Sequence, residues 1–188
     1  MTDLPKIILA SASPRRAEIL RTIGWPFDTL PVQIDESRRP DESAADYVQR
    51  LAREKAETAA ARTVGLNVVG ADTTVVIDDQ ILEKPLDADD ARRMLEMLSG
   101  RWHKVLTGVA VVDRTSTETR VAYQETEVKF ASMSTDELDW YVAGGEPMDK
   151  AGGYAIQGQG ARFTEGIRGD FFNVVGLPVR LLYELFAG

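Results

Sequence analysis

The architecture follows from one stretch, Leu9-Ala10-Ser11-Ala12-Ser13-Pro14-Arg15-Arg16-Ala17-Glu18-Ile19-Leu20. Before it, the apolar run Ile7-Ile8-Leu9 is typical of a buried strand. After it, the spacing of Ala17, Leu20 and Ile23 predicts a helix. The stretch is therefore predicted to contain the end of a strand, a tight turn and the start of a helix.

The predicted helix carries two positive charges at its N-terminal end, where they are unfavourable. Ser13 is a good N-cap, and Pro14 fits the first helical position, where its missing N–H costs nothing. Arg15 and Arg16 follow in the first turn, where the helix dipole already carries partial positive charge. A bound anion would reverse that penalty, because backbone N–H groups and two guanidinium groups would converge on it. An anion site and a solvated helix end, with Arg15 paired to Glu18, are equal alternatives at this point.

Composition limits the classes of function. The 188 residues include 30 acidic and 22 basic side chains, which gives a net charge of −8, and no cysteine. This acidic balance argues against sequence-independent nucleic-acid binding, which needs a basic surface. The lack of cysteine excludes disulfides, thiolate metal sites and a cysteine nucleophile. Because His103 is the one histidine, any metal is expected to be a hard cation on carboxylates.

Length and hydropathy predict a single domain that covers residues 1–188. No apolar run approaches the roughly 18 residues that a membrane helix needs. Residues 1–6 lack the basic-then-apolar order of a signal peptide. We therefore expect a soluble, cytoplasmic protein that has no membrane partner.

Helices and strands are predicted to alternate in the first half of the chain, and strands to dominate the second half. Ser43 with Asp46 and Ser134 with Glu137 form capping boxes at the starts of two helices. The predicted helices after the first cover residues 44–62, 88–98, 135–143 and 179–186. The predicted strands cover residues 7–9, 27–32, 66–71, 73–77, 80–83, 104–113, 120–131, 161–164 and 171–178. This order favours an α/β fold with a mixed sheet.

Four cations and two carboxylates stand at the ends of predicted elements or on their inward faces. Open α/β sheets bind ligands beyond the carboxyl ends of their strands, which is where Asp72 is expected. Polyphosphate hydrolysis needs cations to offset the charge on the phosphoryl oxygens, and a carboxylate to hold a metal or to accept a proton from water. The set consists of Arg15, Arg16, Lys55, Lys84, Asp72 and, in the polar loop after the first helix, Glu36.

Each of these residues also has an ordinary structural interpretation. Lys55 falls on the inward stripe of its helix, where lysines commonly snorkel from the edge of an apolar face. An Asp-Thr pair after a strand is commonly an exposed turn, and Asp35-Glu36 is commonly a solvated loop. Gln157 can bind a base edge with its amide or lie as a satisfied surface side chain. The adjacent Gly158-Gln159-Gly160 is neither a dinucleotide fingerprint nor a Walker A loop.

Six blocks of sequence resemble, in order and spacing, the Maf family of nucleoside triphosphate pyrophosphatases. The resemblance extends from Leu9 to Pro178. The blocks are Ala10-Ser11-Ala12-Ser13-Pro14-Arg15-Arg16; Asp35-Glu36; Gly70-Ala71-Asp72-Thr73 with Leu82-Glu83-Lys84-Pro85; Ser99-Gly100-Arg101-Trp102-His103; Lys150-Ala151-Gly152-Gly153-Tyr154-Ala155-Ile156-Gln157-Gly158; and Gly169-Asp170-Phe171-Phe172-Asn173-Val174-Val175-Gly176-Leu177-Pro178. One departure is Glu83, where the family often has glycine before the lysine.

The resemblance implies an α/β fold with a mixed twisted sheet, flanking helices and two lobes around a central cleft. It also implies a divalent cation, Mg²⁺ or Mn²⁺, and hydrolysis between the α and β phosphates of a nucleoside triphosphate. By similarity, Asp72 would be the general base and would share the metal with Glu36. The triphosphate would be held by Ser11, Arg15, Lys55 and Lys84. A homodimer is a further expectation of the resemblance.

Base selection separates the branches of this family. The sequence is similar to the dTTP/UTP-preferring branch at Arg16, Thr73 and Gln157. The branch that acts on 7-methyl-GTP would carry glutamate in place of Gln157 and tryptophan near Arg16. The main hypothesis is therefore a dTTP/UTP pyrophosphatase that also acts on modified pyrimidine triphosphates. A nucleotide-binding regulator of cell division and septum formation, and a 7-methyl-GTP pyrophosphatase, are the alternatives.

Overall fold

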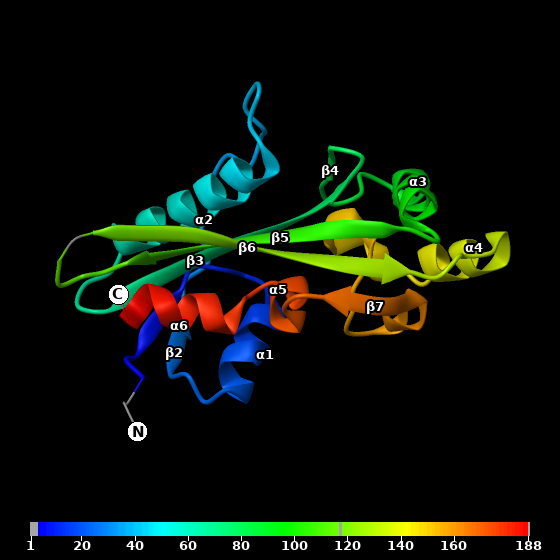
Figure 1. Cartoon of the computed structure of the whole chain (residues 1–188). Coiled ribbons are helices and arrows are strands. Elements are labelled where there is room, and N and C mark those ends of the chain that lie inside the picture. Colours follow the sequence, from blue (N-terminus) through cyan, green and yellow to red (C-terminus); the bar gives the residue numbers. More distant parts are fainter. Residues whose placement is uncertain (1–3, 117, 188) are drawn as a thin grey trace. The chain divides into compact units, whose positions relative to one another are not determined.

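The structure, a computed structural model, describes residues 4–116 and 118–187 and divides into two compact units (Figure 1). Unit 1 consists of the described residues within Met1–Asp72, Thr107–Gln124 and Gly176–Gly188. Unit 2 consists of Thr73–Leu106 and Glu125–Val175. The two predicted lobes correspond to these two units.

One open, mixed sheet contains the seven strands of the described residues, which confirms the predicted fold class. The strands are β1 (Ile7–Leu9), β2 (Phe27–Thr29), β3 (Asn67–Ile77), β4 (Gln80–Leu82), β5 (Trp102–Val112), β6 (Thr119–Phe130) and β7 (Thr164–Arg168). Their order is β2-β1-β3-β5-β6-β7, with β4 paired to β3 off this path. β1 is parallel to β2 and β3, whereas the β3–β4 and β6–β7 pairs are antiparallel.

Helices accompany the strands along the whole chain. The α-helices are α1 (Pro14–Thr22), α2 (Ala44–Ala60), α3 (Ala88–Leu98), α4 (Thr135–Ala143), α5 (Phe171–Val175) and α6 (Val179–Ala187). Among the described residues of the second half, three 3₁₀ segments occur, namely η1 (Glu146–Asp149), η2 (Ala151–Gly153) and η3 (Gln159–Phe163). Across residues 4–116 and 118–187, no helix combines the length and the hydropathy needed to span a bilayer.

Helix α2 packs unusually closely on the strands of unit 1 (Figure 1). A Cβ atom added to Gly70 on β3 would lie 2.1 Å from the carbonyl oxygen of Ala52, and one added to Gly108 on β5 would lie 2.2 Å from that of Val48. Any side chain at either glycine would therefore push the helix away. Small residues of the same core allow this approach, namely Ala10, Ala52, Ala56, Ala59, Ala60 and Ala110.

The predicted N-termini of two helices are confirmed. The hydroxyl of Ser43 accepts the N–H of Asp46 at 3.1 Å at the start of α2. At the start of α4, the hydroxyl of Ser134 accepts the N–H of Glu137 at 3.3 Å, while the Glu137 carboxylate accepts the Ser134 N–H at 2.8 Å. Only the second pair is a reciprocal capping box, because the aspartate of the first lacks the length of glutamate.

Asp72 lies inside a strand, so its predicted position at the carboxyl end of a strand 66–71 is wrong. Strand β3 continues through Asp72 to Ile77, because the β-branched residues beyond it pair with β4. The neighbouring strand β1, however, pairs with β3 only as far as Leu9 opposite Val69. Asp72 therefore lies beyond the carboxyl end of β1, where parallel sheets bind ligands.

Two predicted strands in the second half are also wrong. Residues 161–164 belong largely to η3, and the strand β7 begins only at Thr164. Residues 171–175 form α5, where the carboxylate of Asp170 accepts the N–H of Phe172 at 2.8 Å. Short apolar runs do not distinguish strand from helix by periodicity, and here a local acceptor at the helix start favours the helix.

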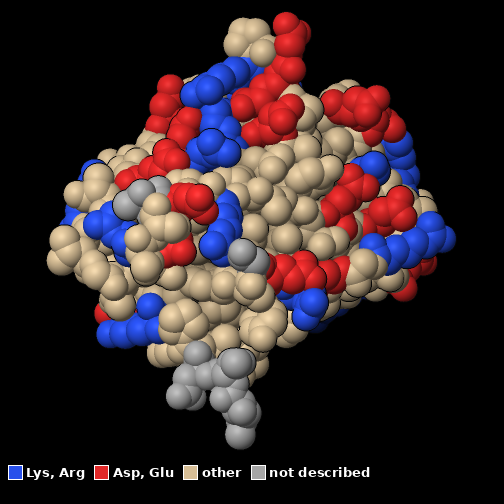
Figure 2. All heavy atoms as spheres, turned by 60° about the vertical axis from the view of Figure 1, so that its left-hand side comes forward, with Lys and Arg blue, Asp and Glu red and all other residues tan. Residues whose placement is uncertain are grey.

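A buried ion pair holds the polar loop 33–43 onto α2. The guanidinium of Arg50 on α2 donates two hydrogen bonds to the carboxylate of Glu42, of 2.6 and 2.9 Å. The two side chains are 11% and 7% exposed. Arg50 also donates to the carbonyl of Ser37 at 3.1 Å. Figure 2 shows basic and acidic side chains side by side at the top of the view, where this loop rises in Figure 1.

The carboxyl group of Glu42 gives this anchor a pH dependence. The hydrogen bonds from Arg50 lower its pKa from 4.5 to about 2, against the opposing effect of burial. Because the pKa is lower in the folded state, the stabilisation is complete above pH 5 and is lost as the pH falls from 4.5 toward 2. The shift corresponds to on the order of 3 kcal/mol.

We predict that Glu42→Gln lowers the free energy of unfolding at pH 7 by roughly 1–3 kcal/mol, because it leaves the buried Arg50 guanidinium with Glu54, 3.4 Å away, as its remaining carboxylate partner. The difference from the wild type should shrink between pH 5 and pH 3. Urea unfolding at pH 7, 5 and 3 measures it, with Glu57→Gln, exposed on the same helix, as the control. A difference that stays constant over this range would show that Glu42 is not the titrating anchor.

Candidate active site

A lysine ammonium between two carboxylates forms the centre of the candidate site. Lys55 Nζ lies 2.6 Å from Oε1 of Glu36 and 2.7 Å from Oδ1 of Asp72. The Lys55 and Asp72 side chains are 11% and 13% exposed, whereas that of Glu36 is 48% exposed. Lys55 is therefore no snorkelling lysine, and three residues from a helix, a strand and a loop of unit 1 meet at one point.

The packing of unit 1 brings these three groups together. Ala52, which meets Gly70 on β3, precedes Lys55 by one helical turn, so the close contact of α2 with β3 also brings Lys55 to Asp72. The hydroxyl of Tyr47, also on α2, donates to the carbonyl oxygen of Glu36 at 3.0 Å. Helix α2 thus supplies the cation and also fixes the backbone of the loop that carries the second carboxylate.

The start of α1 carries a second fixed group. Arg16 donates from Nε to the carbonyl of Gly176 at 2.7 Å and from Nη1 to the hydroxyl of Ser11 at 3.0 Å. The same hydroxyl accepts the N–H of Ser13 at 3.2 Å. Ser13 occupies the N-cap position as predicted, but its own side chain makes no capping hydrogen bond. The helix start is thus built around Ser11 rather than capped by Ser13.

Electrostatics link the two clusters of unit 1. Burial lowers the pKa of Arg16, and the neighbouring Arg15 lowers it further, while the carboxylates of Asp72 and Glu36 act in the opposite direction. Asp72 is the larger of these two opposing influences. Two arginines and two carboxylates are therefore close enough to influence one another, as an anion site with a nearby cation-binding pair requires.

Three predicted site residues, Thr73, Lys84 and Gln157, belong to unit 2. Thr73 follows Asp72 directly on β3, so the two side chains leave the strand on opposite faces. Lys84 and Gln157 are both exposed. Their segments adjoin, because the N–H of Gly152 donates to the carbonyl of Glu83 at 3.0 Å. Glu83, the departure from the family pattern, is also exposed.

The candidate metal ligands are two carboxylates, those of Glu36 and Asp72. Within the described ranges 4–116 and 118–187, no group of three or more Asp, Glu or His side chains is arranged to hold an ion. Glu36 and Asp72 nevertheless direct their oxygens at one cation, which here is the Lys55 ammonium. The two carboxylates are hard oxygen donors of the kind that Mg²⁺ and Mn²⁺ prefer.

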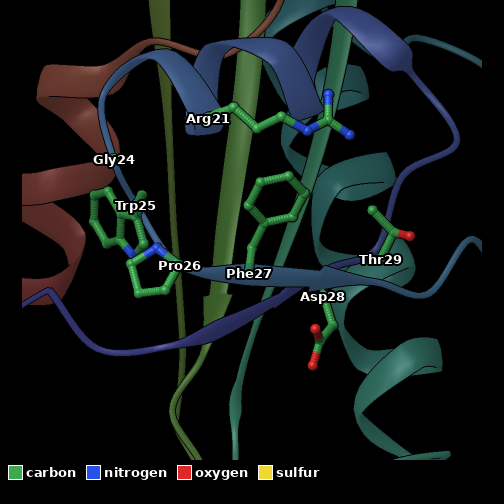
Figure 3. A pocket seen from close by; sticks show the side chains of 7 residues that line it. All are labelled: Arg21, Gly24, Trp25, Pro26, Phe27, Asp28 and Thr29. Atoms are coloured by element: carbon green, nitrogen blue, oxygen red, sulfur yellow. The ribbon is translucent and has the colours of Figure 1, made fainter.

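An open pocket of about 550 Å³ lies elsewhere on unit 1, between the end of α1 and β2 (Figure 3). Figure 3 shows Arg21 reaching across the ring of Phe27, with 5.6 Å from its guanidinium carbon to the ring centroid. Asp28 at its edge pairs with Lys6 at 2.7 Å. With one lining arginine, this pocket lacks the several cations that a triphosphate requires. Its lining contains none of the predicted site residues.

Several supporting residues had no signal in the sequence. Tyr47 and Arg50 lie on an amphipathic helix where their spacing indicates only burial or exposure. Their roles depend on a loop that folds back onto α2, and such a contact leaves no local pattern. His103 is buried, and its Nε2 lies 2.8 Å from the hydroxyl of Tyr154. Burial lowers the pKa of His103 to about 4, which keeps the ring neutral at pH 7.

Known proteins resemble this chain over nearly its whole length. A protein of Symbiobacterium thermophilum named dTTP/UTP pyrophosphatase is 49% identical over 182 residues, covering 97% of this chain and 93% of that protein. Proteins of the same name from Anaeromyxobacter dehalogenans and Escherichia coli are 50% and 46% identical, covering 93% and 98% of this chain and 89% and 93% of their own lengths.

A solved structure shares the fold. The Ham1 protein of Staphylococcus aureus superposes with a TM-score of 0.50 at 12% identity, over 97% of this chain and 98% of that one. The sequence profile described as "Maf-like protein" matches residues 6–188. The arrangement of Ser11, Arg16, Lys55 and Asp72 thus lies within a profile match that spans almost the whole chain. The chain belongs to the Maf family.

Proposed function

We propose that this protein hydrolyses dTTP and UTP between the α and β phosphates, giving the nucleoside monophosphate and pyrophosphate. The observation that carries the proposal is the position of the Lys55 ammonium, in contact with both Glu36 and Asp72. Relatives named dTTP/UTP pyrophosphatase, at 46–50% identity, support the substrate. Modified pyrimidine triphosphates share the recognised groups and belong to the same proposal.

Asp72 is proposed as the general base. A water oxygen attacks the α-phosphorus, the bond from that phosphorus to the α–β bridging oxygen breaks, and the water proton passes to the Asp72 carboxylate. The geometry supports this role, because a carboxylate that is 13% exposed and set in a strand is held rigidly. The Lys55 ammonium would shift from Asp72 to a phosphate oxygen, which would free the carboxylate for the proton.

A divalent cation, Mg²⁺ or Mn²⁺, is part of the proposal. Glu36 and Asp72 would hold it, since their oxygens already converge on one positive charge. Bound there, the ion would offset the charge that develops on the phosphoryl oxygens. Such ions commonly bind through one or two protein carboxylates together with substrate phosphates, which fits a pair of acidic ligands.

The remaining proposed roles divide between the two units. In unit 1, Ser11, Arg15 and Lys55 would bind the triphosphate, and Arg16 would contribute to base selection from a position fixed by Gly176 and Ser11. In unit 2, Lys84 would bind phosphate, and Thr73 and Gln157 would contact the base. A nucleotide substrate is consistent with the expected cytoplasmic location. The expected homodimer is testable by light scattering at several concentrations.

A panel of triphosphates tests the proposed function. Pyrophosphate release should be fastest with dTTP and UTP and at least about tenfold slower, in kcat/KM, with CTP, ATP, GTP and 7-methyl-GTP. Titration with Mg²⁺ and Mn²⁺ in the same assay gives the metal requirement. A preference for a purine nucleotide would contradict the proposal, and tight dTTP binding without turnover would instead indicate a regulator.

Replacement of Asp72 by asparagine tests the base. Asp72→Asn should lower kcat roughly 10²–10⁴-fold, because it removes the proton acceptor and leaves the shape unchanged. The affinity for dTTP, measured by calorimetry, should change far less. Asp78→Asn, in the exposed turn between β3 and β4, is the matched control and should keep the wild-type rate. A near-wild-type kcat for Asp72→Asn would exclude Asp72 as the base.

A further inference from the structure

The segment that carries Gln157 is anchored on both sides of an exposed tip. Residues 154–156 are buried, residues 157–159 are exposed, and Gly160 is buried again. At the tip, Gly158 has φ 132° and ψ −150°, a conformation essentially confined to glycine. A tip of this kind would sample many conformations unless the flanking backbone were tied down, so the residues that tie it determine where Gln157 lies.

A single carboxylate, that of Glu146 on η1, ties the C-terminal side of the tip. Its Oε2 accepts the N–H of Gln159 at 3.0 Å, and its Oε1 accepts the N–H of Gly160 at 3.0 Å. A Cβ atom added to Gly158 would lie 2.6 Å from Oε2 of Glu146, so the backbone passes directly over the carboxylate. Hydrogen bonds of this kind to an ionised acceptor are stronger than those between neutral groups.

The hydroxyl of Tyr141 extends this anchor to the N-terminal side. It donates to Oε1 of Glu146 at 2.7 Å and accepts the N–H of Ala155 at 3.2 Å. Tyr141 is fully buried on α4, and its ring lies against that of Phe163, with 5.5 Å between centroids. Burial would raise the pKa of Glu146, but the hydrogen bonds from Gln159, Tyr141 and Gly160 lower it overall, so the acceptor is a carboxylate at pH 7.

Tyr154 adds a second fixed point on the N-terminal side. Its hydroxyl lies 2.8 Å from Nε2 of His103, and its ring packs edge-to-face on Phe130 with 4.6 Å between centroids. This contact holds Tyr154 but reaches no backbone group beyond it. The two residues between Tyr154 and Gln157 are Ala155 and Ile156, and they are tied instead through the N–H of Ala155 to the Tyr141 hydroxyl and so to Glu146.

We propose that Glu146, acting with Tyr141, is a positioning residue that fixes Gln157 and thereby sets the preference for pyrimidine over purine triphosphates. The inference rests on the proposed function, because it is the proposed function that has Gln157 contact the base of the substrate. Among the described residues, the Glu146 carboxylate accepts hydrogen bonds from Tyr141, Gln159 and Gly160, all in unit 2. Its removal should therefore affect recognition of the base and leave the chemical step intact.

Two conservative substitutions test the anchor. Glu146→Gln keeps the size of the side chain but places an amide NH₂ against a backbone N–H, and Tyr141→Phe removes the hydroxyl and keeps the packing. Each should raise the KM for UTP about tenfold, leave kcat within about threefold, and lower the UTP-over-GTP ratio of kcat/KM about tenfold. Glu146→Asp, which retains the charge, should recover part of this ratio. Glu165→Gln and Tyr123→Phe, both exposed, are the matched controls.

A second readout does not depend on activity. Amide exchange followed by NMR should find the N–H groups of Gln159, Gly160 and Ala155 protected in the wild type, and exchange at Gln159 and Gly160 should be at least about tenfold faster in Glu146→Gln. Faster exchange with an unchanged UTP-over-GTP ratio would overturn the inference. An equal loss of kcat with every triphosphate would overturn it too, since that is the result of a merely structural role.

The failure of the proposed function has a different signature. A wild-type enzyme that does not prefer UTP to GTP would contradict the proposed substrate class and with it the assignment of Gln157. If the wild-type enzyme prefers UTP to GTP and the Glu146→Gln and Tyr141→Phe variants keep the same preference, only the role of Glu146 is contradicted. The wild-type ratio therefore separates the two failures before any variant is measured.

Discussion

One lysine ammonium shared by two carboxylates is the interaction on which the proposed chemistry depends. Lys55 lies within 2.7 Å of both Glu36 and Asp72, and without a cation there the two carboxylates would repel each other in a partly buried place. The arrangement therefore demands positive charge at that point, from the lysine or from a metal ion. In the proposed mechanism, the Lys55 ammonium exchanges the Asp72 carboxylate for a phosphate oxygen of the substrate. The cluster can therefore change from the observed arrangement to a substrate-bound one without leaving a charge unpaired.

Close packing makes this interaction possible. Gly70 and Gly108 bring α2 against the strands at distances that no other residue permits, and the alanines of the helix keep that face narrow. The loop with Glu36 is held to the same helix by Tyr47 and by the buried Arg50–Glu42 pair. Helix α2 is thus the scaffold of the cluster. Of the residues proposed to read the base, Arg16 belongs to unit 1, and Thr73 and Gln157 belong to unit 2.

Local patterns in the sequence predicted most of the fold, and tertiary contacts account for what they missed. Capping residues and apolar periodicity identified α2, α3 and α4, because these signals are confined to a few neighbouring residues. The apolar run 171–178 predicts a strand, but residues 171–175 form a helix because apolar content alone does not distinguish the two. The run 66–71 predicts a strand that ends before Asp72, whereas pairing with β4 extends β3 to Ile77. Charge singles out the cations and carboxylates of the candidate site, and the family resemblance adds Ser11, Thr73 and Gln157. Glu146, Tyr141 and Glu42 have no such signal, because their contacts join segments that share no sequence spacing.

The position of water attack tests the central claim most directly. Hydrolysis of dTTP in H₂¹⁸O, followed by mass spectrometry of both products, reports which phosphorus the water attacks. Attack at the α-phosphorus, next to the proposed base Asp72, predicts one ¹⁸O atom in dTMP and none in pyrophosphate. Label in the pyrophosphate, or release of inorganic phosphate with dTDP as the product, would contradict the account.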